Sequence, residues 1–283
     1  MKSTNQNVIK LEEYLQDKFD TKSIRIPILP DVAGKVIYLV NDPDVGINEV
    51  VSLLQKDPVI TAHVIKVANS TAYSPATKIV NLHHAASMLG TNLLSEIALS
   101  VSLRSGIFIL KGYIPIMKDI IKYTIATSLF TKELFGLAEA DFDSLYLASM
   151  FYTAGMPVTL YHIDEFRKNE KIEFTDQEIN LYLRKFKNKY VSLVLDKWAI
   201  DSDIKTIVNN HHNKSEVSSM HTECGLLRLS KELAKWVFDD SYDTKLILDS
   251  KELIDLNIHP DNLTSIFNNK EWIKNKAEEL TKY

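Results

Sequence analysis

The chain has 283 residues, of which 45% are hydrophobic and 25% are charged. These fractions are typical of globular proteins, and they exclude a disordered or fibrous chain. The formal net charge is −4 and neither half of the chain is basic, so the charge balance argues against a nucleic-acid-binding protein. Only 8 glycines and 8 prolines interrupt the chain, which favours helices joined by short loops.

The chain contains a single cysteine, Cys224, so no intrachain disulfide can form, which agrees with a reducing compartment. The amino-terminal residues lack the apolar stretch of a secretory signal. No run approaches the ~18 apolar residues of a membrane span. We therefore expect a cytoplasmic protein that makes no membrane contact.

The first predicted element is an amphipathic helix over Val8–Phe19, within an amino-terminal segment of residues 1–20. Its apolar residues are Ile9, Leu11, Leu15 and Phe19. Such a helix can bind a partner protein. Packing against its own domain is the favoured interpretation, because an apolar stripe of this kind usually faces the core of the same chain.

Helix boundaries are legible in the segment that follows. One helical stripe is formed by Ile47, Val50, Val51 and Leu54. Asp57 before Pro58 fits an N-cap with proline at the first helical position. Gly90 suits a left-handed helix end, and the candidate caps on its two sides are Asn81 and Asn92.

The remaining elements are also predicted to be helices. A glycine and a proline interrupt the pattern at Lys111–Pro115, which marks a candidate boundary between two helical parts. Residues Asp141–Ala154 are apolar on nearly every side and predict a central buried helix. Thr175 and Glu178 fit a capping box, and Asn213–Ser219 is polar and turn-like. The predicted fold is all-α, with no strand-length alternation.

Few patterns point directly to catalysis. No two of the 8 histidines have the spacing of three or four that places ligands on one helix face. Glycine-rich phosphate loops and the G-x-S-x-G nucleophile motif are absent from the sequence. Cys224 is interpreted as a small apolar packing residue.

Two further sets of residues have structural interpretations. A basic cluster could meet a phosphate but is interpreted as a solvated helix face: Arg184, Lys185, Lys187 and Lys189. The tryptophans lie among aliphatic residues and are expected to be core anchors: Trp198, Trp236 and Trp272.

One series of short motifs resembles the HDOD domain, a family related to the HD phosphohydrolases and widespread in bacterial signalling proteins. The series consists of Ile28-Leu29-Pro30, Asn41-Asp42-Pro43, Gln55-Lys56-Asp57-Pro58, Ala68-Asn69-Ser70, Tyr73, Ile79, Ala85 and Leu89-Gly90. A weaker match continues through Tyr123-Thr124, Leu147–Pro157, Trp198 and His211-His212. The resemblance covers residues 21–215.

The resemblance implies an amino-terminal helical bundle joined to a degenerate HD-like helical part, with the boundary near residues 111–115. Residues 216–283 are expected to complete the second bundle, and they could also form a homodimer contact. The family implies a regulatory role rather than a catalytic one.

The residues themselves bear on catalysis. Active HD enzymes hold a metal ion with histidines and aspartates, yet this chain has no His-Asp dipeptide. Tyr152-Thr153 stands where that pair is expected, and Tyr123 stands where the first histidine is expected. Because a phenol and a hydroxyl are poor ligands for a divalent cation, we expect no metal, no cofactor and no catalytic residue.

The preferred hypothesis is a non-catalytic signalling protein that binds another protein or a small effector. Its candidate site is a vestigial pocket formed by Tyr123, Tyr152, Thr153, His211 and His212, although these side chains could equally fill the cavity. The alternative hypothesis is a diverged metal-dependent phosphohydrolase that acts on a nucleotide or cyclic dinucleotide. The identity of the partner or effector stays open.

Overall fold

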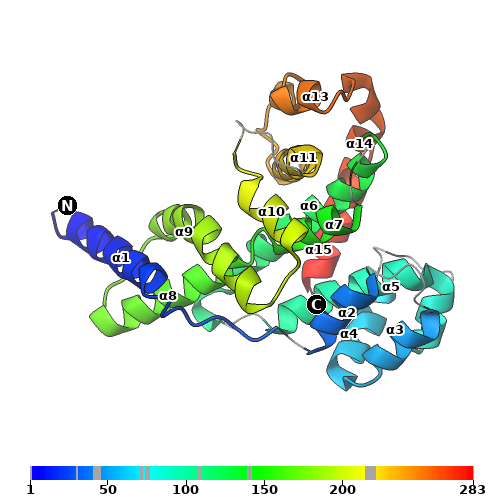
Figure 1. Ribbon diagram of the computed structural model, residues 1–283, viewed down its shortest axis with the longest axis horizontal. Coiled ribbons are helices and arrows are strands. Elements are labelled where there is room, and N and C mark those ends of the chain that lie inside the picture. Colours follow the sequence, from blue (N-terminus) through cyan, green and yellow to red (C-terminus); the bar gives the residue numbers. More distant parts are fainter. Residues whose placement is uncertain are drawn as a thin grey trace.

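The computed structural model describes residues 2–29, 31–40, 46–70, 73, 77–106, 110–138, 140, 142–213 and 221–282. Across these ranges every regular element is a helix and no strand occurs, which confirms the all-α prediction (Figure 1). Pro30, the Asn41-Asp42-Pro43 motif and most of the turn-like Asn213–Ser219 segment lie outside the described residues.

The helices follow one another closely along the chain. Their bounds are α1 Lys2–Asp20, α2 Asp31–Val40, α3 Ile47–Leu54, α4 Pro58–Ala68, α5 Leu82–Gly106, the 3-10 turn η1 Lys111–Tyr113, α6 Ile114–Phe135, α7 Phe142–Phe151, α8 Gly155–Glu170, α9 Asp176–Lys197, α10 Ser202–Asn210, α11 His221–Phe238, α12 Lys245–Leu248, α13 Lys251–Asp255, the 3-10 turn η2 Pro260–Leu263, α14 Thr264–Asn268 and α15 Lys270–Lys282. Among the described helices, none combines the length and apolarity that a membrane crossing requires.

The predicted helix starts are confirmed by their cap hydrogen bonds. Asp57 Oδ1 accepts from the backbone N–H of Ile60 at 3.1 Å, and Pro58 is the first residue of α4. Asn81 Oδ1 accepts from the backbone N–H of His84 at 2.8 Å before α5. Thr175 and Glu178 make both bonds of the predicted capping box at the start of α9. Each cap satisfies a backbone donor that the helix itself leaves unpaired.

Gly90 separates two helical stretches within α5, in agreement with the predicted helix end at this residue. It has φ 80° and ψ 165° inside α5, a backbone conformation that is essentially confined to glycine. The chain resumes helical geometry immediately afterwards, so the first helical stretch of α5 ends at Gly90 and a second begins after it. The predicted cap at Asn92 falls on a side chain that is outside the described part of the structure.

Asn69 explains one of the family motifs physically. Its side-chain Nδ2 donates to the Ile79 carbonyl at 2.7 Å, and its Oδ1 accepts from the Ile79 backbone N–H at 2.8 Å. This pair of hydrogen bonds fixes the backbone of Ile79 to the end of α4. A side chain without both a donor and an acceptor cannot make it.

The described apolar side chains form two core clusters. The larger cluster joins α2–α5 with α7, α10, α11, the carboxy-terminal helices and the second half of α6. The smaller cluster joins α1, η1, α8, α9 and the beginning of α6. In Figure 1, α1, α8 and α9 lie at one side of the molecule and α2–α5 at the other, with α6 between them. The predicted division of the chain into segments stays a prediction.

Helix α1 packs on its own chain, as predicted. Leu11 and Leu15 are fully buried against α8 and α9, whereas Ile9 was expected on the packed side and is 53% exposed. Among the tryptophans, Trp198 and Trp236 pack against the larger core, but Trp272 is 47% exposed. The core-anchor prediction is therefore wrong for Trp272.

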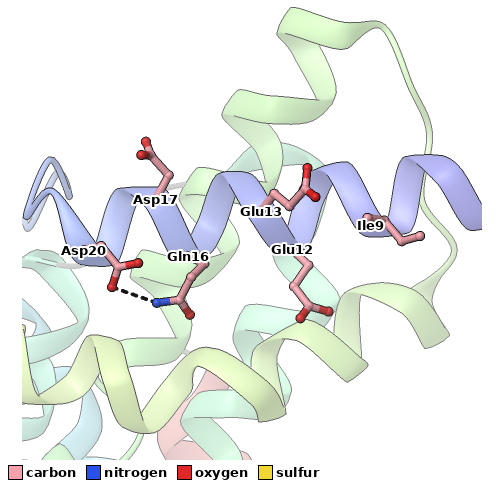
Figure 2. A pocket seen from close by; sticks show the side chains of 6 residues that line it. All are labelled: Ile9, Glu12, Glu13, Gln16, Asp17 and Asp20. Carbon is pink, nitrogen blue, oxygen red and sulfur yellow. Dashed lines mark hydrogen bonds between the residues drawn. The ribbon is translucent and has the colours of Figure 1, made fainter.

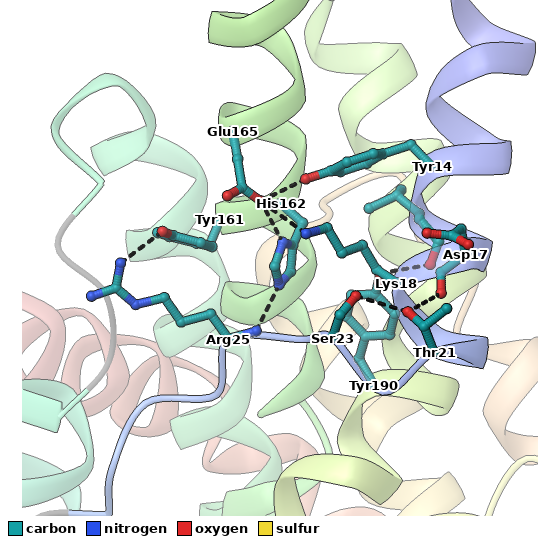
Figure 3. A network of polar contacts seen from close by, with 11 residues as sticks. Tyr14, Asp17, Lys18, Thr21, Ser23, Arg25, Tyr161, His162, Glu165 and Tyr190 are labelled. Carbon is teal, nitrogen blue, oxygen red and sulfur yellow. Dashed lines mark hydrogen bonds and ion pairs between the residues drawn. The ribbon is translucent and has the colours of Figure 1, made fainter.

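A polar network fastens α1 and the segment after it to α8 (Figure 3). Tyr14 O–H donates to Glu165 at 2.5 Å, and His162 Nδ1 lies 3.0 Å from the same carboxylate. The backbone N–H of Arg25 donates to His162 Nε2 at 3.1 Å. Because Nε2 is an acceptor here, the ring proton is on Nδ1, and the imidazole is neutral. Burial lowers the pKa of His162, in agreement with this assignment.

Candidate functional site

The five predicted pocket residues lie in two neighbouring cavities. Tyr123 on α6 lines a cavity of about 720 Å³ together with Tyr152 and Thr153, which follow α7; we call it the large cavity. His211 and His212, which follow α10, line a cavity of about 440 Å³, the small cavity. The Tyr152 and His211 rings meet edge to face with centroids 6.0 Å apart, so the two cavities share a wall.

Hydrogen bonds hold the two residues after α7 against α6. Thr153 Oγ1 lies 2.7 Å from Thr124 Oγ1, and the Tyr152 oxygen lies 3.0 Å from Thr127 Oγ1. Thr124 and Thr127 each donate their proton to a carbonyl one turn back in α6. Thr153 and Tyr152 must therefore be the donors of the two contacts between the helices.

The same contacts define the chemistry of Tyr152. Burial raises its pKa to about 12, and the hydrogen-bonding contact with Thr127 offsets only part of that effect. The phenol is thus neutral near neutral pH, and its proton is already used. A neutral, hydrogen-bonded phenol is a weak ligand for a divalent cation.

His211 is fully buried and neutral. Its Nδ1 lies 2.7 Å from the Val208 carbonyl and must donate to it, so the proton is on Nδ1 and Nε2 carries a lone pair. Within the described part of the chain, Nε2 has no hydrogen-bond partner. Burial lowers the pKa of His211 well below its ordinary value, and the positive charge of Lys231 acts in the same direction.

Lys231 on α11 lines both cavities and was not identified from the sequence. Its Nζ lies 5.5 Å from the centroid of the Tyr152 ring, within cation–π distance. Burial lowers the pKa of Lys231 to about 7, and the positive charges of Lys187 and Lys235 contribute to the shift. The residue lies beyond the segment that resembles the HDOD domain, and a lone lysine in an amphipathic helix gives no sequence signal.

The predicted basic cluster on α9 divides between two faces. Arg184 and Lys187 line the large cavity. Lys185 forms an ion pair with Glu12, and Lys189 donates to Gln16, so both contact α1 instead. The prediction of one solvated face is therefore wrong for Lys187, which is half-buried. Cys224 is 3% exposed in the larger core, which confirms that it is a packing residue.

The donor set does not fit the divalent cation of the HD enzymes. His211 Nε2 is a suitable nitrogen donor, but the charged groups that line the large cavity near Tyr152 are mostly ammonium or guanidinium groups. The carboxylates in the small cavity are engaged: Glu232 accepts from Lys235 and Tyr242, and Glu252 pairs with Arg228. Among the described residues, no group of three or more His, Cys, Asp or Glu side chains is placed to hold a metal ion.

A third hollow of about 490 Å³ lies on the outer side of α1 (Figure 2). It is lined by Ile9, Glu12, Glu13, Gln16, Asp17 and Asp20. Gln16 Nε2 donates to Asp20 at 2.8 Å, and the side chains of Glu12 and Gln16 also contact Lys185 and Lys189 of α9. The side chains come from one helix face and form an acidic surface rather than an enclosed site.

Comparison with known proteins shows the same architecture. A family model described as the HDOD domain matches residues 26–214, which is more than half of the chain. No curated protein sequence matches this chain significantly. An HDOD domain protein of unknown function from Geobacter sulfurreducens superposes with a TM-score of 0.71 at 17% identity, covering 98% of this chain and 99% of that one.

Two further solved structures have related folds and different names. A protein from Shewanella amazonensis, provisionally named a metal-dependent phosphohydrolase, has a TM-score of 0.69 at 20% identity, covering 96% of this chain and 99% of its own. A provisionally named signal transduction protein from Marinobacter aquaeolei has a TM-score of 0.65 at 17% identity, covering 97% of this chain and 66% of its own. At these identities the similarities establish the fold alone. With the family model matched over most of its length, the chain belongs to the HDOD domain family.

Proposed function

We propose that this HDOD protein is a non-catalytic regulator that works by binding an effector in the large cavity. The observation that supports the proposal is that cationic and neutral side chains are found where the resemblance to the HD enzymes predicts metal ligands. Tyr152 and Thr153 donate their protons to Thr127 and Thr124 of α6. The same cavity is lined by Lys187 and by Lys231, which is partly protonated near neutral pH because its pKa is about 7. A divalent metal ion bound in this cavity would be repelled by the positively charged lysine side chains.

The position of the large cavity suits a regulatory role. It is lined by α6, the turn after α7, α9 and α11, so an effector there contacts elements of both core clusters. Binding that favours one arrangement of these helices shifts the population of the whole molecule by the difference in affinity. The change in helix arrangement on effector binding then alters the helical surface that contacts a partner protein or a second copy of this chain.

The second candidate function is that of a diverged phosphohydrolase acting on a nucleotide or cyclic dinucleotide. One observation favours it: His211 Nε2 is a buried lone pair without a partner in the described residues, as a metal ligand would be before binding. The similarity to a provisionally named phosphohydrolase agrees with this reading at the level of fold.

Metal analysis and turnover separate the two candidates. The protein is purified from medium supplemented with manganese, iron and zinc, and is then incubated with a panel of phosphate esters and Mn²⁺. We expect substoichiometric metal and no turnover above that of a His211→Ala, His212→Ala control. Stoichiometric metal, or turnover that the double variant abolishes, would overturn the regulator proposal.

A further inference from the structure

We propose that the effector of the large cavity is a phosphate-bearing small molecule with a flat ring, of the nucleotide class. Its phosphate would lie among Arg184, Lys187 and Lys231, and its ring against the apolar side of the same cavity. This inference rests on the proposed function, because it names the chemistry of the effector that such a regulator binds.

The cavity holds positive charge that its own carboxylates do not neutralise. Four basic residues line it, and the acidic residue among its lining is Asp119. Asp119 already pairs with Lys122 at 2.8 Å, and Lys235 pairs with Glu232 at 2.7 Å. In the part of the chain that the structure describes, the other three basic residues make no ion pair: Arg184, Lys187 and Lys231.

Such an arrangement is costly without an anion. Burial lowers the pKa of both half-buried lysines, Lys187 and Lys231; the charges of Lys235 and Arg184 add to the shift at Lys187, and the charge of Lys187 adds to the shift at Lys231. Like charges that are partly removed from water repel strongly, because the effective dielectric constant is lower than in bulk solvent. A bound dianionic phosphate would replace this repulsion with attraction, favour the protonated form of Lys231, and accept charge-assisted hydrogen bonds from both lysines.

The rest of the cavity lining is largely apolar and aromatic. Its hydrophobic lining consists of Ile116, Ile120, Met156 and Leu183, next to the rings of Tyr123 and Tyr152. The Tyr123 ring is held edge to face against Phe238 with centroids 5.1 Å apart. An inorganic phosphate uses none of this surface, whereas a ring compound does. A volume of about 720 Å³ is within the usual range of small-molecule sites.

Two amides at the rim provide the remaining recognition. Gln177 and Asn180, in the first turns of α9, line the same cavity. A carboxamide both donates and accepts hydrogen bonds, so it can pair with the edge of a nucleobase. Charge, aromatic surface and amides together favour a nucleotide over a simple anion or an apolar ligand.

Calorimetric titration of the full chain tests the inference. The probes are ATP, GTP, cyclic di-GMP and inorganic phosphate, and the variants are Lys187→Met and Lys231→Met. The control is Lys185→Met, which removes a lysine of the same helix that pairs with Glu12 outside the cavity. We expect at least one nucleotide to bind, with affinity about tenfold weaker in each cavity variant and unchanged in the control.

The outcomes separate this inference from the proposed function. Absence of nucleotide binding up to about 1 mM, or equal binding by wild type and both cavity variants, would overturn the inference and leave the regulator proposal standing. Inorganic phosphate binding as tightly as every nucleotide would refute the nucleotide assignment. Chromatography of the recovered ligand completes the test: intact ligand agrees with both proposals, and converted ligand overturns the regulator proposal alone.

Discussion

Gly155 is the position where a single methyl group is expected to damage the protein most. It is the first residue of α8 and is buried against α9. A Cβ atom there would lie 2.5 Å from the Val191 backbone nitrogen and 3.1 Å from the Val191 Cα, and it would also overlap the Lys187 carbonyl. All three obstructing atoms belong to the backbone, so no side-chain rotation relieves the clash.

The cost of Gly155→Ala follows from that geometry. Overpacking a core usually costs about 1 to 3 kcal/mol. Here α9 must shift as a rigid element, so we expect the upper end of the range, about 3 kcal/mol. For a chain of this size, each kcal/mol lowers the melting temperature by roughly 2 to 4 °C. The expected loss is therefore about 6 to 12 °C.

Thermal unfolding followed by circular dichroism measures the effect. The matched control is Gly136→Ala, since a Cβ at Gly136 meets no atom within 4 Å and its φ is −69°. The control should melt within about 2 °C of the wild type. The reasoning fails if Gly155→Ala melts as late as the control. Because Lys187 lies on the displaced surface of α9, the variant should also lose nucleotide affinity.

Two more predictions concern buried charge. Arg228→Met should cost about 3 kcal/mol, because it removes the buried ion pair with Glu252, 3.2 Å from Arg228 Nε, and the hydrogen bonds that Arg228 donates to the His211 and Asn213 carbonyls. Urea unfolding measures the loss, and a change below about 1 kcal/mol would contradict it. Acid should also weaken the fold, because burial lowers the pKa of His162 and His211 below 6.5. The stability that these neutral imidazoles provide is present above pH 6.5 and is lost as pH falls below it, since the unfolded chain then binds more protons. Urea midpoints at about pH 7.5 and pH 5.5 should show a drop that His162→Gln reduces and the exposed-site control His259→Gln does not; equal midpoints would refute the argument.

Local chemistry made much of the fold predictable. The caps at Asp57, Asn81 and Thr175 depend on side chains within three residues of the backbone groups they satisfy. The all-α fold follows from the helical periodicity and sparse glycine. At Gly90 the sequence correctly indicated a helix end with positive φ, but the angle between the two helical stretches depends on packing that the sequence does not display.

The candidate site was less predictable because it joins distant segments. The resemblance to a family indicated Tyr123, Tyr152 and His211, and the structure distributes them over two adjacent cavities. Lys231 gave no signal, since an exposed lysine and one turned toward a cavity look alike in a helical pattern. The charge of the large cavity arises only when α9 and α11 are brought together.

Helix α6 belongs to both core clusters. Its 22 residues span about 33 Å. Residues of its first turns, such as Ile116 and Ile120, pack into the smaller cluster, and Ile125 and Phe130 further along pack into the larger one. Unfolding of either cluster removes the tertiary contacts of about half of this helix, and an isolated helical segment of about 11 residues is marginal in water. Because both clusters share α6, we expect the chain to unfold cooperatively, as one unit, although its apolar residues form two separate clusters.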